Sequence, residues 1–222
     1  EKISSSDLVI EAVFEDLKLK QNLYKKIEPH LKESAILASN TSTLPITKLA
    51  EVLKDSTRFI GIHFFSPVDK MNLVELIKSE KTNDIALAVA LDYTSLIKKT
   101  PIVVNDSRGF YANRCIIPYI NEGLRMLNEG IEPALVENAA KQIGMPVGPL
   151  QLLDELSVSL ALNVARETKE ALGTKYEETG TENILLEMSQ KNRLGRKELA
   201  GFYEYDEKGR RLRLWEGLSN LN

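Results

Sequence analysis

The sequence has 222 residues, a formal net charge of -3 and charges of both signs mixed along the chain. This length is enough for one or two domains with a hydrophobic core, and the charge argues against a nucleic-acid-binding surface. The single cysteine excludes an internal disulfide and a multi-cysteine metal site, and no apolar run approaches the length of a membrane span. The first residues also lack the pattern of a signal peptide, so we expect a soluble intracellular protein without a metal.

Strands and helices alternate in the first hundred residues. The predicted strands are short apolar runs at 8–13, 35–38, 58–64, 72–77 and 101–104. The predicted helices lie between them, at 15–32, 45–53 and 84–98. This alternation is typical of an α/β fold with a largely parallel sheet that helices cover on both faces.

The pattern becomes helical after the loop at 105–109. Helices are predicted at 110–128, 133–143, 149–172 and 182–192, and a β-hairpin at 202–205 and 211–215. Pro118 is expected to kink the first of these helices, and Cys115 to be a buried, inert thiol because its neighbours are apolar. The chain therefore divides into an α/β region, 1–106, and a helical region, 107–222.

Three short segments place polar or titratable side chains at the ends of apolar runs. They lie at 39–42, 63–67 and 73–75. An open α/β sheet usually carries its chemistry outside the carboxyl ends of its strands. A hydroxyl, an imidazole and a carboxylate are thus expected within reach of one another. Of the two histidines, His30 and His63, only His63 has such a position.

Glu75 lies inside an apolar run, where a carboxylate must face water or find a partner. If the strands at 58–64 and 72–77 are neighbours, Glu75 lies beside residues 61–63. A His63–Glu75 pair would then orient the imidazole as a general base. The alternative is an edge strand with Glu75 facing solvent, and the pattern alone leaves the two equally open.

Other polar residues also allow both a structural and a functional interpretation. Residues 40–43 could cap the following helix or bind a polarised oxygen. Asn113, early in an apolar helix, could be a satisfied buried group, face solvent or point into a cleft between the two regions. Glu15 and Lys20 are interpreted more simply as an acid that complements the helix dipole and a solvated lysine.

Several common motifs do not occur in the sequence. It contains no Gly-x-Gly fingerprint, no phosphate-binding loop, no His-Glu-x-x-His and no Cys-x-x-Cys. An α/β sequence that opens on a mid-sheet strand without a phosphate loop is expected to be a fragment.

Six ordered motifs extend over nearly the whole chain. They are Ser-Asn-Thr-Ser, His-Phe-Phe-Ser-Pro-Val, Leu-Val-Glu, Arg-Gly-Phe-Tyr-Ala-Asn-Arg, Pro-Val-Gly-Pro and Ala-Gly-Phe-Tyr. In sequence and order they resemble the L-3-hydroxyacyl-CoA dehydrogenases of fatty acid β-oxidation. The ending, Gly-Phe-Tyr-Glu-Tyr-Asp-Glu-Lys-Gly, is most similar to multifunctional α-subunits, which join an enoyl-CoA hydratase/isomerase to this dehydrogenase. The resemblance implies the C-terminal part of a Rossmann NAD-binding domain, followed by a helical domain for substrate binding and dimerisation.

The resemblance also implies roles for individual residues. His63 would be the base and Glu75 its orienting partner, and the substrate oxygen would be held by Ser42 and Asn113. The residues that would contact NAD are Glu15, Lys20, Ser42, Ser66 and Lys197; many single-function members carry Asn in place of Ser66. The first βαβ unit of the family, with its glycine-rich turn, has no counterpart here. We therefore expect these residues alone to bind NAD weakly and to be inactive.

The activity implied by the resemblance is NAD-dependent oxidation of L-3-hydroxyacyl-CoA to 3-oxoacyl-CoA. The implied partners are an acyl-CoA substrate, a second copy bound through the helical domain, and a thiolase subunit in the parent complex. The implied location is the bacterial cytoplasm or, in a eukaryote, the mitochondrial matrix or peroxisome. Two alternatives remain: another β-hydroxyacid dehydrogenase, which would use a catalytic lysine, and a non-catalytic assembly module.

Overall fold

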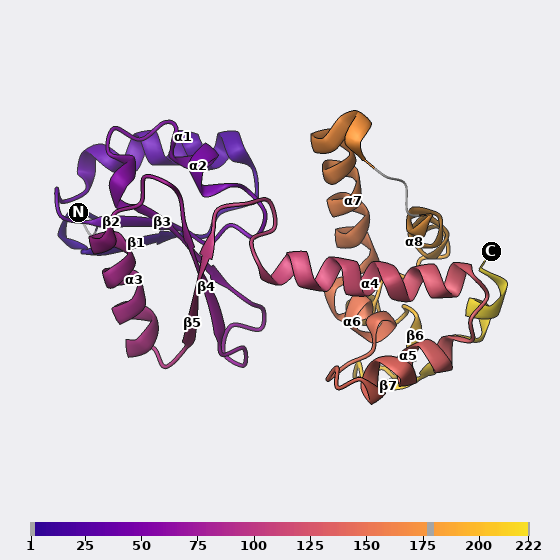
Figure 1. Ribbon diagram of the computed structural model, residues 1–222. Helices are drawn as coiled ribbons and strands as arrows, with labels where there is room; N and C mark the ends of the chain where they lie inside the picture. Colours follow the sequence, from indigo (N-terminus) through magenta and orange to yellow (C-terminus); the bar gives the residue numbers. More distant parts are fainter. Residues whose placement is uncertain (1–2, 177–179, 222) are drawn as a thin grey trace. The chain divides into compact units, whose positions relative to one another are not determined.

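The computed structural model describes residues 3–176 and 180–221. The chain forms two compact units, residues 1–114 and 115–222 (Figure 1). Helix α4 (Ala112–Asn128) contains the boundary between them. The boundary predicted after residue 106 lies in the loop that leads into this helix.

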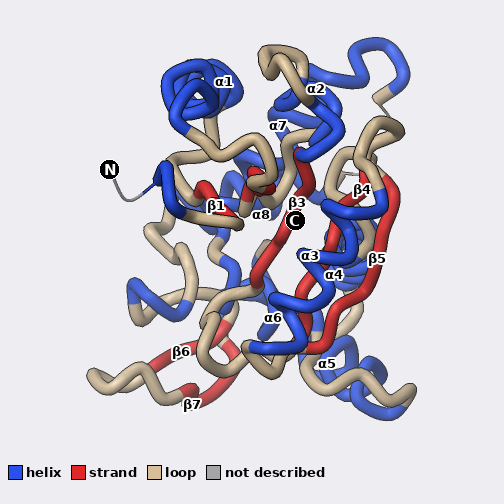
Figure 2. Tube along the Cα trace, turned by 90° about the vertical axis from the view of Figure 1, so that its left-hand side faces the viewer, coloured by secondary structure: helices blue, strands red, loops and turns tan. Residues whose placement is uncertain are grey.

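The first unit contains a five-stranded sheet, shown in red in Figure 2. Its strands, in spatial order, are β1 (Leu8–Glu11), β2 (Ile36–Ser39), β3 (Phe59–Phe64), β4 (Leu73–Lys78) and β5 (Thr100–Asn105). All neighbours are parallel except β3 and β4, which are antiparallel. The loop between these two strands is too short for the crossover that a parallel pair needs. The predicted α/β fold is confirmed, as a mixed sheet.

Helices cover both faces of this sheet. One face packs against α1 (Leu17–Ile27) and α2 (Ile46–Ala50), and the other against α3 (Asp84–Leu96). The side chain of Asp16 caps α1 by accepting from the N–H of Leu19, and a 3₁₀ turn that contains Pro29 follows α1. The predicted helix at 15–32 is therefore shortened at both ends, since a proline cannot donate to a helix interior.

Helix α2 is capped from a distant part of the chain. It begins after Pro45 without a side-chain cap of its own, so of the two interpretations of residues 40–43, the one as a cap of this helix is wrong. The carboxylate of Asp106, in the loop after β5, instead accepts from the N–H groups of Ile46 (2.8 Å) and Thr47 (2.7 Å). A carboxylate at this position satisfies free N–H groups and interacts favourably with the helix dipole.

Replacement of Asp106 by alanine should destabilise the first unit. We expect the free energy of unfolding to fall by about 1–2 kcal/mol, as for loss of a helix cap. Urea denaturation measures this change. Asp69→Ala, at an exposed position in the loop after β3, makes the same change in charge and should have little effect. Equal losses in the two variants would mean that Asp106 does not cap α2.

The second unit consists of helices and a hairpin. Its further elements are α5 (Pro133–Gln142), α6 (Pro149–Leu156), α7 (Val158–Leu172), α8 (Thr181–Gln190) and the antiparallel strands β6 (Tyr203–Tyr205) and β7 (Arg211–Leu214). The single helix predicted at 149–172 is wrong. Ser157 has a φ of 93° and interrupts it, and its side chain then caps α7 by accepting from the N–H of Leu160.

The buried face of α4 explains why Cys115 is exposed rather than buried as predicted. Ile120, Leu124 and Leu127 face the core of the second unit. These residues are three or four positions apart and form one stripe of the helix, and Cys115 lies outside that stripe. Helix α4 continues through Pro118; the kink there stays a prediction.

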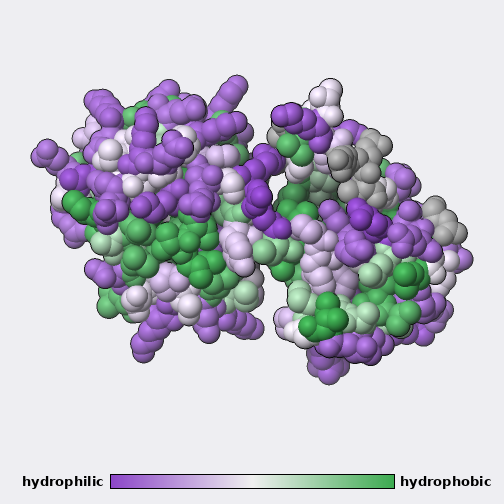
Figure 3. Space-filling view, in the orientation of Figure 1, coloured by the Kyte–Doolittle hydropathy of each residue, from purple (hydrophilic) through white to green (hydrophobic). Residues whose placement is uncertain are grey.

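Hydrophobic residues also gather on the surface. Figure 3 shows them as a band across the visible face of the first unit. In the second unit, the exposed fractions of Leu135, Ile143 and Leu160 are 59%, 81% and 50%. Within residues 3–176 and 180–221, no helix combines the length and the apolar character that a membrane crossing requires.

Candidate active site

Strands β3 and β4 bring His63 and Glu75 together. The two residues are directly opposite in the antiparallel register, and Nδ1 of His63 lies 2.7 Å from Oε2 of Glu75. Both are buried, with exposed fractions of 4% and 0%. The predicted pairing of the two strands is confirmed. The edge-strand alternative is wrong, because β5 pairs with the other side of β4.

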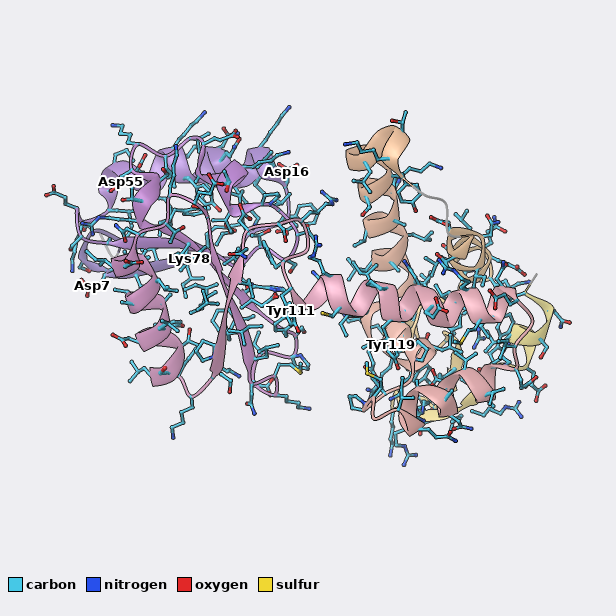
Figure 4. The ribbon with its side chains drawn as sticks, in the orientation of Figure 1. Asp7, Asp16, Asp55, Lys78, Tyr111 and Tyr119 are labelled. Atoms are coloured by element: carbon cyan, nitrogen blue, oxygen red, sulfur yellow. The ribbon has the colours of Figure 1, made fainter. Side chains whose placement is uncertain are left out.

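The other oxygen of Glu75 binds the start of α4. Oε1 accepts from the backbone N–H of Tyr111 (3.0 Å) and Ala112 (2.8 Å); Figure 4 labels Tyr111 where the chain enters this helix. Burial by itself would raise the pKa of Glu75. The hydrogen bonds from His63, Ala112 and Tyr111 outweigh burial, so this pKa lies below its ordinary value. Glu75 is therefore a carboxylate at neutral pH.

The charge of Glu75 sets the tautomer of His63. An ionised carboxylate can only accept hydrogen bonds, so Nδ1 of a neutral imidazole carries the proton that Glu75 binds. The remaining nitrogen, Nε2, then has a free lone pair. This arrangement is that of an oriented general base.

Two phenylalanines lie beside the imidazole. The ring centroids of Phe65 and Phe110 are 4.5 Å and 5.9 Å from that of His63. Phe110 is buried and has a φ of 53°, which is uncommon for a residue other than glycine. Neither residue was predicted from the sequence to belong to the site. Their place within the motifs that contain His63 and Asn113 was the only available signal.

The loop after β2 contacts both β3 and α4. Oδ1 of Asn40 accepts from the N–H of Phe64 (2.9 Å), next to His63. Nδ2 of Asn113 donates to the backbone oxygen of Ser42 (3.0 Å), and Ser42 itself is exposed. The structure thus brings Ser42 and Asn113 together, and holds the loop that carries Ser42 next to the strand end that carries His63.

The carboxylate of Glu15 also holds this loop in place. Its Oε1 accepts from the hydroxyl of Thr41 (2.6 Å) and the N–H groups of Ser42 (2.9 Å) and Thr43 (3.0 Å). Burial alone would raise the pKa of Glu15, but these hydrogen bonds and the charge of Lys20 hold it below its ordinary value. Its side chain keeps an exposed fraction of 34%, so the carboxylate is charged and accessible.

Lys20 is fully buried, and its interpretation as a solvated lysine is wrong. Its Nζ donates to Oε1 of Glu11 (2.6 Å) and to the carbonyl of Val13 (3.0 Å). Glu11 ends β1 and is also buried, with an exposed fraction of 5%. Glu11 was not predicted from the sequence; the available signal was a charged residue inside a predicted apolar strand.

Comparisons with known proteins identify the family of the chain. Residues 1–107 match the family model described as 3-hydroxyacyl-CoA dehydrogenase, NAD binding domain. Residues 109–205 match the model of the C-terminal domain of the same family. The chain belongs to the 3-hydroxyacyl-CoA dehydrogenase family. It is thus related to oxidoreductases whose cofactor is NAD.

Solved structures of this dehydrogenase family resemble the chain over most of its length. The (S)-3-hydroxybutyryl-CoA dehydrogenase of Ralstonia eutropha is 38% identical, with a TM-score of 0.83, over 93% of this chain and 73% of that one. The 3-hydroxybutyryl-CoA dehydrogenase of Escherichia coli is 29% identical, with a TM-score of 0.84, over 91% and 43%. The dehydrogenase part of a multifunctional enzyme from C. elegans is 29% identical, with a TM-score of 0.66, over 99% and 49%.

The residues that the resemblance implies as NAD contacts differ in how well they fit that task. Glu15 fits, because its side chain is 34% exposed and its Oε2, which lies 3.4 Å from Nζ of Lys20, can accept from a ribose hydroxyl. Lys20 does not fit, because its exposed fraction is 1% and its Nζ is already held by protein acceptors. Ser66 is exposed in the loop after β3, and Lys197 is exposed in the second unit. Their contacts with NAD stay predictions.

Proposed function

We propose that the chain carries the catalytic pair of an NAD-dependent L-3-hydroxyacyl-CoA dehydrogenase of fatty acid β-oxidation. The observation that carries this proposal is the buried contact of 2.7 Å between Nδ1 of His63 and the carboxylate of Glu75. This contact leaves Nε2 as the acceptor for a substrate proton. Two of the similar solved structures are described as 3-hydroxybutyryl-CoA dehydrogenases, which supports the substrate class.

Oxidation of a secondary alcohol removes a proton from oxygen and a hydride from carbon. Nε2 of His63 takes the proton, and the adjacent charge of Glu75 stabilises the imidazolium that forms. When bound, NAD supplies the hydride acceptor. Because both side chains are buried, their mutual attraction is stronger than it would be in water.

Ser42 and Asn113 are proposed to position the substrate oxygen. The hydroxyl of Ser42 is on an exposed residue and can donate to an oxygen as it becomes a carbonyl. The amide of Asn113 holds the backbone of Ser42. Asn113 thereby fixes where that hydroxyl lies relative to the start of α4.

The wider assignment is also a proposal. The motifs at the C-terminal end support a place in a multifunctional α-subunit, with a thiolase as its partner subunit and the bacterial cytoplasm as its location. The exposed hydrophobic residues of the second unit, Leu135, Ile143 and Leu160, support a homodimer through the helical domain. Large exposed apolar side chains favour association when they gather into one patch.

An assay of the full-length protein tests the proposed reaction. We expect NADH formation from L-3-hydroxybutyryl-CoA and NAD, and little from the D enantiomer or from free L-3-hydroxybutyrate. His63→Gln should abolish it, whereas the matched variant at the exposed residue His30, His30→Gln, should not. Faster oxidation of the free acid would favour another β-hydroxyacid dehydrogenase, and a protein without turnover of any of these would favour the assembly module.

A further inference from the structure

A buried cluster of charged and polar side chains joins the end of β1 to α1 and β2, close to the loop that carries Ser42. At its centre, the carboxylate of Glu11 accepts four hydrogen bonds. The donors are the N–H of Val13 (2.6 Å), Nζ of Lys20 (2.6 Å), the hydroxyl of Tyr24 (2.6 Å) and the hydroxyl of Ser39 (2.9 Å). A buried carboxylate with this many donors is fixed in one orientation, and so are the groups that it binds.

Lys20 connects this cluster to Glu15. Its ammonium group makes two hydrogen bonds and one longer ion pair, with three partners. They are Oε1 of Glu11 (2.6 Å), the carbonyl of Val13 (3.0 Å) and Oε2 of Glu15 (3.4 Å). With an exposed fraction of 1%, the lysine has almost no accessible surface to offer a ligand.

Glu15 in turn binds the loop at 41–43 and restricts its conformation. Its Oε1 accepts from Thr41, Ser42 and Thr43, and the carbonyl of Ser42 binds Asn113. A continuous series of contacts therefore extends from β1 to the first turn of α4. All of these residues belong to the first unit.

We propose that Glu11 and Lys20 are positioning residues that act through Glu15. They hold Glu15 so that one oxygen fixes the loop of Ser42 while the other stays accessible to a ribose hydroxyl. Lys20 is then not a ligand of NAD. The effect on NAD rests on the proposed function, whereas the ordering of the loop does not.

A substitution at Tyr24 perturbs the cluster around Glu11 without changing a residue that could contact a ligand. It is fully buried, and burial together with its hydrogen bond to Glu11 raises the pKa of its hydroxyl, which keeps it a neutral donor. Tyr24→Phe removes one of the four donors to Glu11 and preserves the ring. Lys26→Met, at an exposed lysine of α1, is the matched control for Lys20→Met.

The experiment is amide hydrogen exchange in the full-length protein without NAD, followed at Ser42 and Thr43. We expect exchange about tenfold faster in Lys20→Met, as for loss of a charge-assisted hydrogen bond, and a smaller increase in Tyr24→Phe. Lys26→Met should equal wild type. The KM for NAD should rise in the same order, with kcat changed less than KM.

The two roles of Lys20 predict different results. If Lys20 were a ligand of NAD, Lys20→Met would raise the KM and leave exchange at Ser42 and Thr43 unchanged without NAD, and Tyr24→Phe would match wild type in both. That result overturns the positioning role. If Lys20→Met does not fold, Tyr24→Phe alone decides by the same two measurements. Faster exchange in a protein without dehydrogenase activity would instead overturn only the proposed function.

Discussion

Glu75→Gln should lower the kcat of the full-length enzyme by roughly two or more orders of magnitude, with little change in KM. A glutamine side chain is neutral, so it cannot stabilise the imidazolium that His63 becomes when it takes the substrate proton. It also weakens the contact with the N–H groups of Tyr111 and Ala112, which bind the carboxylate in the structure. Steady-state kinetics with an L-3-hydroxyacyl-CoA measures both constants.

A double-mutant cycle tests whether the two residues act as one unit. His63→Gln should be at least as damaging as Glu75→Gln, and the double variant should be little worse than either single one. Glu80→Gln, at an exposed acid that follows β4, is the matched control and should retain wild-type kcat. Additive effects, or a Glu75→Gln enzyme with a near-normal rate, would leave Glu75 only a structural role.

Asp154→Leu should cost the second unit about 3 kcal/mol or more of its free energy of unfolding. Asp154 is 2% exposed and accepts from the N–H of Phe202 (2.8 Å), the N–H of Tyr203 (2.9 Å) and the hydroxyl of Tyr205 (2.8 Å). Leucine would leave these three buried donors without an acceptor. Thermal or urea denaturation measures the loss. Glu207→Leu, at an exposed acid in the hairpin turn, should cost far less.

The same carboxylate should make stability depend on pH. Burial raises the pKa of Asp154 to about 6 from an ordinary value of 3.8, although the hydrogen bonds from Phe202, Tyr203 and Tyr205 and the charge of Arg193 oppose this. The folded state therefore holds the proton more tightly than the unfolded chain. The stabilisation from this group is present below about pH 4 and is lost as the pH rises through about 6.

Asp154→Asn removes the titrating group and preserves its shape. Between about pH 4 and pH 6, the free energy of unfolding of wild type should fall with rising pH relative to that of this variant. Urea denaturation at several pH values gives the two profiles. Parallel profiles across this window would show that Asp154 titrates as it does in the unfolded chain.

The sequence predicted those features that depend on neighbouring segments. The loop between β3 and β4 is short, so pairing of the two strands could be considered from the sequence, and that pairing places Glu75 beside residues 61–63. The pattern left an edge strand equally open, and the structure decides for the pair of His63 and Glu75. The order of strands and helices in the first unit followed from apolar runs and their spacing in the same way. These features are local because few conformations connect two strands that close in sequence.

Features that depend on distant contacts could not be predicted. Asp106 caps α2 from about sixty residues away, and no helix-start signal reports such a cap. The break at Ser157 requires a positive φ that apolar periodicity does not reveal. The role of Glu11 depends on donors from a loop, a helix and a second strand, which the sequence shows only as separate segments.

The register of β3 and β4 determines where the chain can vary in length. His63 and Glu75 lie on the sheet face that packs against α1 and α2, whereas Val74 and Leu76 lie on the face beneath α3. One residue inserted inside β4, ahead of Glu75, would turn the carboxylate into the apolar layer beneath α3 and leave the imidazole without it. An insertion in the loop at 65–72 leaves the strand pairing intact. The chain can therefore vary in length at this connection, while a one-residue insertion or deletion within β4 ahead of Glu75 would separate the catalytic pair.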